Sequence, residues 1–199
     1  MIEVEAKFLV PHEEIREKLK SLGGRMTQPL RQMTRQNAEI PGRAGDGSWI
    51  RVRDEGDGNI TMSFKQVTER TLSGTREICV GVDDFQKSID FLKEVGIVTR
   101  NIQQTRRESW ELAGASIDLD EWPWVPPYIE IEAPDEATVK HVAEMLGLSM
   151  KDALYGSVEP VYIKHYDVTE DEVNAWTEII FTPEVPEWLE KKRRKTPLS

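Results

Sequence analysis

The sequence has very little cysteine, few histidines and no long apolar run. Its 199 residues contain one cysteine, Cys79, so an internal disulfide is excluded. We expect Cys79 to be a core residue, because its neighbours form an apolar strand pattern. His12, His141 and His165 lack the spacing of metal ligands and are expected to have surface or packing roles. The absence of an 18-residue apolar run excludes a transmembrane helix.

Positive charge is also in deficit. The chain carries 36 acidic and 26 basic residues, a formal net charge of −10 at pH 7. This balance argues against a broad nucleic-acid-binding surface, and we expect no membrane partner. A strand pattern begins at once, so no signal peptide is recognisable and a cytoplasmic location is expected. A homodimer is compatible with the sequence.

What the chain does have is an alternation of charged and apolar residues in short stretches. Residues two apart share one face of a strand, so Glu3, Glu5 and Lys7 point the same way. A solvated edge strand would show the same pattern once. Here it recurs at residues 48–54, 59–65, 105–112, 116–122 and 128–133, whose charged faces carry Arg51, Arg53, Lys65, Arg106, Asp118, Asp120, Glu130 and Glu132.

Three segments have apolar residues at helical spacing and could cover the apolar faces of these strands. They span residues 11–22, 83–95 and 135–146, and each is followed by glycine. An antiparallel sheet of this many strands tends to curl or close. The charged faces would then face either solvent or the inside of a barrel. A charged interior would be a ligand site, because unpaired charges are costly to bury.

The signs of the charges narrow the ligand class. Carboxylate oxygens hold Mg²⁺ or Mn²⁺, whereas arginine and lysine hold phosphate oxygens. Both kinds are present on the candidate inner face, so a metal-bound triphosphate is the favoured ligand. The alternative is a set of cross-strand ion pairs on a solvated sheet, which leaves the strict repetition unexplained.

The Glu-x-Glu-x-Lys start at residues 3–7 is followed in order by the strands around Arg51, Lys65, residues 75–78, 105–110, 117–121 and 128–132. In this order the motifs resemble the CYTH superfamily, also called triphosphate tunnel metalloenzymes. The resemblance covers roughly residues 1–166. It implies an α+β fold, a closed eight-stranded antiparallel β-barrel with helices packed outside.

The resemblance also implies roles for individual residues. The implied cofactor is Mg²⁺ or Mn²⁺, held by Glu3, Glu5, Asp118, Asp120, Glu130 and Glu132. The triphosphate would be bound by Lys7, Arg51, Arg53, Lys65, Arg76 and Arg106. Arg76 and Glu77 are adjacent, so only one can point inward, and the sequence leaves that choice open. Lys7, Glu5 and Asp120 are expected to be catalytic.

The chain departs from the family pattern in three places. Gln104 stands where many members have the lysine of a Lys-x-Arg motif, which removes a positive charge. Residues 31–47 lack the usual Asp and Tyr. Arg35 or Arg31 could replace the lost positive charge, although we favour surface positions for both. Residues 122–127 contain three prolines and predict a rigid turn or lid whose tryptophans pack locally.

We expect an enzyme that hydrolyses a nucleoside, thiamine or inorganic triphosphate. The alternative is a class IV adenylyl cyclase, which makes cyclic AMP and pyrophosphate from ATP in the same kind of pocket. A second alternative is a non-catalytic module that binds triphosphate or polyphosphate. The four family carboxylates Glu3, Glu5, Glu130 and Glu132 argue against it, because an anion binder gains little from them without metal.

The C-terminal part is expected to be distinct from the barrel. We predict a tunnel domain at residues 1–166 and a helix with a basic tail at residues 167–199. Thr169 and Glu172 form a capping-box pattern that predicts a short helix toward Trp176. The basic cluster near the end favours a solvated tail over a recognition arm. A third interpretation, that this part closes one mouth of the tunnel, stays open.

Overall fold

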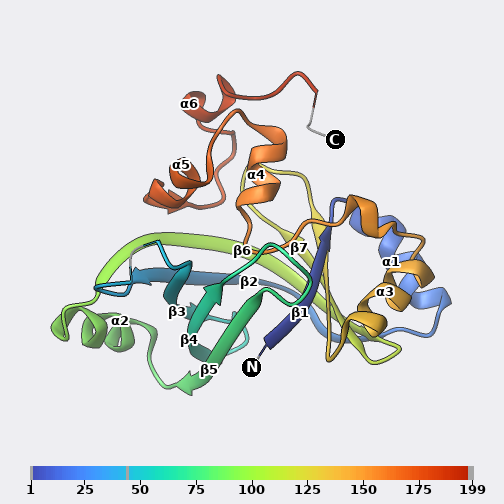
Figure 1. The fold of residues 1–199 in the computed structure, drawn as a ribbon, viewed down its shortest axis with the longest axis horizontal. Helices are drawn as coiled ribbons and strands as arrows, with labels where there is room; N and C mark the ends of the chain where they lie inside the picture. Colours follow the sequence, from blue (N-terminus) through green and yellow to red (C-terminus); the bar gives the residue numbers. More distant parts are fainter. Residues whose placement is uncertain (1, 44, 197–199) are drawn as a thin grey trace.

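The strands close into a barrel. The computed structural model describes residues 2–43 and 45–196. The barrel strands are β1 (Ile2–Phe8), β2 (Arg25–Glu39), β3 (Ser48–Asp54), β4 (Ile60–Val67), β5 (Thr75–Val82), β6 (Val98–Leu112), β7 (Ala115–Glu121) and β8 (Tyr128–Ala133). Their order is β2-β3-β4-β5-β1-β8-β7-β6, and a pairing of β2 with β6 closes the ring. Neighbours are antiparallel, so the predicted closed eight-stranded barrel of the α+β class is confirmed (Figure 1).

The two longest strands, β2 and β6, are each 15 residues long and run side by side across the barrel (Figure 1). Their pairing shifts register at three points, which bends this wall. Sequence analysis did not identify β2, because its residues are largely polar and only Met33, Arg35 and Ala38 are buried. A two-residue strand, β9 (Glu178–Ile179), adds to β6 in parallel.

Helices α1 (His12–Ser21) and α3 (Glu136–Met145) cover the apolar outer faces of the strands at one end of the barrel (Figure 1). Ile15 and Leu19 of α1 and Val142 of α3 are fully buried against Ile117 and Ile131 of the wall. Both helices lie within the predicted segments. Burying each such aliphatic side chain contributes roughly 1.5–3 kcal/mol, so these helices fix which strand face points outward.

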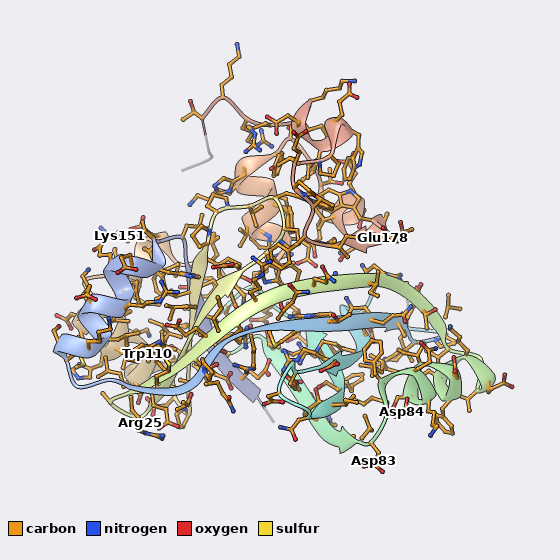
Figure 2. The ribbon with its side chains drawn as sticks, turned by 180° about the vertical axis from the view of Figure 1, so that it is seen from behind. Arg25, Asp83, Asp84, Trp110, Lys151 and Glu178 are labelled. Carbon is orange, nitrogen blue, oxygen red and sulfur yellow. The ribbon has the colours of Figure 1, made fainter. Side chains whose placement is uncertain are left out.

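Helix α2 (Phe85–Glu94) covers the opposite end of the barrel and begins at Asp84, whose side chain accepts a hydrogen bond from the Lys87 amide. Ile89 and Leu92 pack on Val52 of β3. Figure 2 places Asp84 and Trp110 at opposite ends of the barrel, so the wall is supported from outside at both. Within the described residues, no helix is both long and apolar enough to cross a membrane.

The C-terminal helices α4 (Glu159–His165), α5 (Glu170–Ala175) and α6 (Glu187–Glu190) form a separate layer above the barrel (Figure 1). A turn of 3-10 helix, η1 (Met150–Asp152), precedes them. The predicted capping box of Thr169 and Glu172 is confirmed at the start of α5. Tyr162 of α4 and Tyr166, the residue after that helix, belong to one apolar cluster with Val173 of α5. The cluster therefore crosses residue 166, and the domain boundary placed there stays a prediction.

The tryptophans of the 122–127 turn contact distant parts of the chain, so the prediction that they pack locally is wrong. Trp124 makes edge contacts with Trp176 and Trp188, at 6.3 Å between ring centroids in each case, and Trp122 packs against Arg35. The basic cluster folds back rather than extending as a solvated tail: Lys192 bonds with Glu172, and Arg194 lies 2.9 Å from Asp167. The last three residues of that predicted tail lie outside the described residues.

Candidate functional site

The barrel encloses a cavity of about 1320 Å³. Its wall is built mainly from the inward faces of the strands, as the alternation of the sequence indicates, and residues of the loops and of helices α4 and α5 complete it. The charged side chains that line it from β1 to β8 are Glu3, Glu5, Lys7, Arg35, Glu39, Arg51, Arg53, Lys65, Glu77, Arg100, Arg107, Glu130 and Glu132. A cavity with this many charges needs either internal pairing or a charged ligand.

Lys7 lies at the centre of the acidic wall, the part of the cavity lined by Glu3, Glu5, Glu130 and Glu132. β1 and β8 are in register with Lys7 opposite Glu130 and Glu5 opposite Glu132. The Lys7 Nζ donates to Glu5 at 3.1 Å, to Glu130 at 2.8 Å and to the Gly156 carbonyl at 2.6 Å. Burial disfavours the lysine charge, but Glu130 and Glu5 outweigh it and raise the pKa of Lys7. Lys7 therefore stays charged and holds the two carboxylates together.

The pKa values of the two carboxyl groups beside Lys7 are shifted in opposite directions. Burial raises the pKa of Glu5 well above its ordinary value, and the charge of Glu130 adds to the effect. Burial also opposes the charge of Glu130, but Lys7 and a hydrogen bond from Glu5 hold the pKa of Glu130 well below its ordinary value. Of the two, Glu5 therefore holds a proton more readily than Glu130.

A second group of ion pairs links β1, β3, β4 and β5. The Lys65 Nζ lies 3.0 Å from Glu3 Oε2 and 2.9 Å from Glu77 Oε2, and Arg51 donates to Glu77 at 3.0 Å. Burial raises the pKa of Glu3 to about 7, and a hydrogen bond with Glu77 reinforces the shift. Glu77, left open by the sequence, is the inward member of its pair. Arg76 is exposed and does not line the cavity, so its inclusion in the triphosphate site is wrong.

The predicted inward position of Arg106 is also wrong. Arg106 lies outside the wall, with its guanidinium carbon 4.2 Å from the ring centre of Phe181 and 3.7 Å separating Nη1 from Glu121. The next residue, Arg107, lines the cavity. Packing decides which residues of β6 point inward. Trp110 and Leu112 belong to the core outside the barrel, and Arg106 lies on their side because residues two apart share one face of a strand.

Arg107 binds the two aspartates of β7. It donates to Asp120 through Nε at 2.7 Å and Nη2 at 2.6 Å, and Nη1 lies 2.5 Å from Asp118. Nη2 also reaches Glu130 at 3.0 Å. Neither aspartate lines the cavity, and Asp120 is fully buried. The structure therefore places both behind Arg107, where they orient its guanidinium.

With Arg107 inward, a Lys-x-Arg motif ending at this arginine falls on Thr105, Arg106 and Arg107. Thr105 rather than Gln104 occupies the lysine position. Gln104 points away from the cavity and accepts a hydrogen bond from the Phe181 amide at 3.1 Å. Cys79, expected in the core, is exposed and lines the cavity. Cys79 lies opposite Ser63 on the polar, inward face of the β4–β5 pair, which explains the error.

Sequence reasoning favoured a surface position for Arg35, but the side chain is buried and lines the cavity. Among the charged wall residues named above, only Arg35 and Glu132 have no opposite charge within 4.0 Å in the described part of the chain. One is a cation and the other an anion. The sequence did contain a signal: Met33, Arg35 and Asn37 are spaced two apart and so share one face of a strand. The strand was hard to recognise because β2 has no apolar face.

The donor chemistry of the acidic wall fits a hard divalent cation. Glu3, Glu5, Glu130 and Glu132 all line the cavity and offer only oxygen ligands. Lys7 or Lys65 is paired with three of them, and burial raises the pKa of Glu132. The described residues contain no cluster of acidic, histidine or cysteine side chains already arranged to hold a metal ion. A cation bound here would take the place of the lysines beside these carboxylates.

Residues 1–157 match the CYTH domain, and the chain belongs to this family. No curated protein matches the chain. Its fold resembles the PH1012 protein of Pyrococcus horikoshii, at 22% identity and a TM-score of 0.67, covering 76% of this chain and 94% of that one. A Vibrio parahaemolyticus protein provisionally named an adenylate cyclase has 16% identity, a TM-score of 0.69 and coverages of 81% and 97%.

A chain of the Schizosaccharomyces pombe Mediator head module shares the fold at 12% identity, with a TM-score of 0.54 and coverages of 77% and 98%. At these identities the similarities show the fold alone. Because one fold supports different functions, the activity has to be argued from the side chains in the cavity.

Proposed function

We propose that this protein is a divalent-metal-dependent phosphoryl-transfer enzyme that hydrolyses a triphosphate inside its barrel. The supporting observation is the gathering of both signs of charge within one cavity. Four acids come from β1 and β8, most of the arginines and lysines come from β2, β3, β4 and β6, and Lys7 of β1 and Glu77 of β5 lie between groups of opposite charge. Phosphoryl transfer depends mostly on positioning and electrostatic stabilisation, and this arrangement offers both.

In this proposal Glu3, Glu5, Glu130 and Glu132 hold Mg²⁺ or Mn²⁺. When bound, the metal neutralises charge on phosphate oxygens and lowers the pKa of a water molecule. Lys7 does not transfer a proton, because its pKa is raised. It fixes the positions of Glu5 and Glu130 instead.

Arg51, Arg53, Lys65 and Arg107 bind the phosphate oxygens. Each is paired with a carboxylate in the ligand-free protein, so substrate binding is an exchange of partners. Arg53, for example, donates to Glu55 at 2.7 Å. Asp118 and Asp120 act as positioning residues that hold the Arg107 guanidinium in a fixed direction. The existing ion pairs keep the cations oriented before the triphosphate arrives.

One observation favours the cyclase as the second candidate. The cavity exceeds the roughly 300–1,000 Å³ typical of small-molecule sites, which leaves room for an organic group beside a triphosphate. Asn37, Asn101 and Gln103 line it, and Asn37 donates to Asn101 at 2.9 Å. Amides of this kind can hydrogen-bond a nucleobase. Cyclisation would follow if the ribose 3′-hydroxyl, rather than water, attacked the α-phosphorus.

Product analysis tests the proposal. ATP, thiamine triphosphate and inorganic triphosphate would be offered separately with Mg²⁺, with Mn²⁺ and with EDTA. Phosphate release that needs metal and yields no cyclic AMP supports the triphosphatase. Cyclic AMP with pyrophosphate from ATP supports the cyclase. Tight binding without turnover of any substrate identifies a binding module.

A further inference from the structure

Arg35 differs from the other cations in the cavity in its surroundings. It extends from the middle of β2, is 7% exposed, and has its guanidinium carbon 4.8 Å from the ring centre of Trp122. Its Nη2 donates to Thr105 Oγ1 at 2.7 Å. Its Nε is buried and has no hydrogen-bond partner among the described residues. The guanidinium is therefore held by one aromatic face and one hydroxyl, both uncharged.

Among the described residues, no carboxylate lies within ion-pair distance of Arg35. Asp120 is the acid that favours its charge most, yet no ion pair joins them within 4.0 Å, and Asp120 binds Arg107 through two bonds. Burial lowers the pKa of Arg35 well below its ordinary value, and Arg53, Arg51 and Arg107 add to that effect. The ligand-free protein thus keeps a buried cation among three others, an arrangement that is costly.

We propose that Arg35 is a phosphate-binding residue whose counter-ion is the substrate's triphosphate. This inference rests on the proposed function and extends it to a side chain from β2. Trp122 and Thr105 hold the guanidinium in place without using up its charge. The free Nε and the remaining N–H groups then donate to phosphate oxygens, as charge-assisted hydrogen bonds require.

The proposal predicts that replacing Arg35 lowers the affinity for triphosphate without lowering the stability of the protein. In Arg35→Gln the uncompensated charge is gone, so the ligand-free protein should be at least as stable as the wild type. Its affinity for triphosphate should fall by about tenfold to a hundredfold, the worth of one charge-assisted hydrogen bond. A merely structural arginine would give the reverse: lower stability and unchanged affinity.

A second variant tests whether the charge itself matters. Thr105 lies on β6 beside the guanidinium and shares the inward face with Gln103 and Arg107, which line the cavity. In the double variant Arg35→Gln/Thr105→Lys, the new ammonium occupies the space of the lost guanidinium. We expect it to restore most of the affinity. Arg25→Gln is the matched control, because Arg25 is an exposed β2 arginine at the barrel's periphery, paired with Glu111 (Figure 2).

The experiment measures binding of tripolyphosphate with NH in place of the bridging oxygens, in Mg²⁺, by calorimetry, and the melting temperature without ligand. Weaker binding without loss of stability in Arg35→Gln, recovered in the double variant, supports the proposal. Equal binding by wild type and Arg35→Gln overturns it and leaves the proposed function intact. No binding by the wild type overturns both. If Arg35→Gln fails to fold, Arg35→Met takes its place; it also removes the positive charge, so unchanged affinity in that variant overturns the proposal.

Discussion

Arg106 and Arg107 are consecutive in β6, yet their guanidinium groups lie on opposite sides of the barrel wall. Arg106 covers Phe181 on the outside, whereas Arg107 binds Asp118, Asp120 and Glu130 on the inside. The pleat of a strand requires this separation. The function of two chemically identical side chains is thus decided by which neighbours pack against the outer face.

This relationship predicts different outcomes for the same substitution at the two positions. Arg107→Gln should lower kcat/KM by about a hundredfold or more, because it removes a phosphate-binding fork. Arg106→Gln should stay within about twofold of the wild type, since a half-exposed cation outside the cavity contributes little. Arg107→Lys provides a folded comparison if the glutamine variant is unstable. A larger loss in Arg106→Gln than in Arg107→Gln would contradict the assignment of faces.

Replacing the acids should separate metal binding from substrate binding. Glu5→Gln and Glu132→Gln should abolish turnover at ordinary Mg²⁺ concentrations, because each removes a carboxylate from the acidic wall. Arg53→Gln should mainly raise KM. Initial rates over a Mg²⁺ titration check this, with Glu111→Gln, an exposed acid paired with Arg25, as the control. Unchanged activity in both glutamate variants would rule out the metal assignment.

Metal affinity should depend on pH through Glu3. Its pKa is raised to about 7 from 4.5, so the metal-free protein holds a proton on this carboxyl below pH 7 and loses it above. A cation must displace that proton, so Mg²⁺ affinity falls as the pH drops through about 7, with proton release largest between 5 and 7. Calorimetry at pH 6 in buffers of different ionisation enthalpy measures the release. Release of the same size in Glu3→Gln would show that another group supplies the proton.

We expect replacement of Lys7 to lower the stability of the protein and added metal to restore part of it. In Lys7→Met the buried carboxylates of Glu5 and Glu130 lose their shared cation, which should cost about 3–5 kcal/mol of unfolding free energy. Added Mg²⁺ should recover a substantial part by taking the place of the ammonium. Urea unfolding with and without Mg²⁺ provides the measurement. A variant as stable as the wild type without metal would contradict the central position given to Lys7.

Much of the barrel follows from the sequence, because six strands combine an apolar face with a charged one. The same pattern places Glu3, Glu5, Lys7, Arg51, Arg53, Lys65, Glu130 and Glu132 in one cavity. The sequence analysis failed where that contrast is absent. β2 is polar on both faces, so Arg35 had no periodic context. In β6 the charged residues 106, 107 and 108 are adjacent, and only Trp110 packing outside resolves which one points inward.

The pairing of charges is not readable from the sequence either. Asp118 and Asp120 share the inward face, as predicted, but only the register of β6 against β7 puts Arg107 opposite Asp120 and so keeps both aspartates from the cavity. Likewise, the absence of a counter-ion at Arg35 depends on Asp120 being bound elsewhere. Such relationships arise from three strands at once, and no single stretch encodes them.

The measurement that tests the account most directly is a crystal structure with Mn²⁺ and a non-hydrolysable triphosphate, using the anomalous signal to locate the metal. The account predicts an anomalous peak among Glu3, Glu5, Glu130 and Glu132, with phosphate oxygens contacting Arg35 and Arg107. Manganese bound only outside the barrel, with the original ion pairs of the cavity intact, would contradict it.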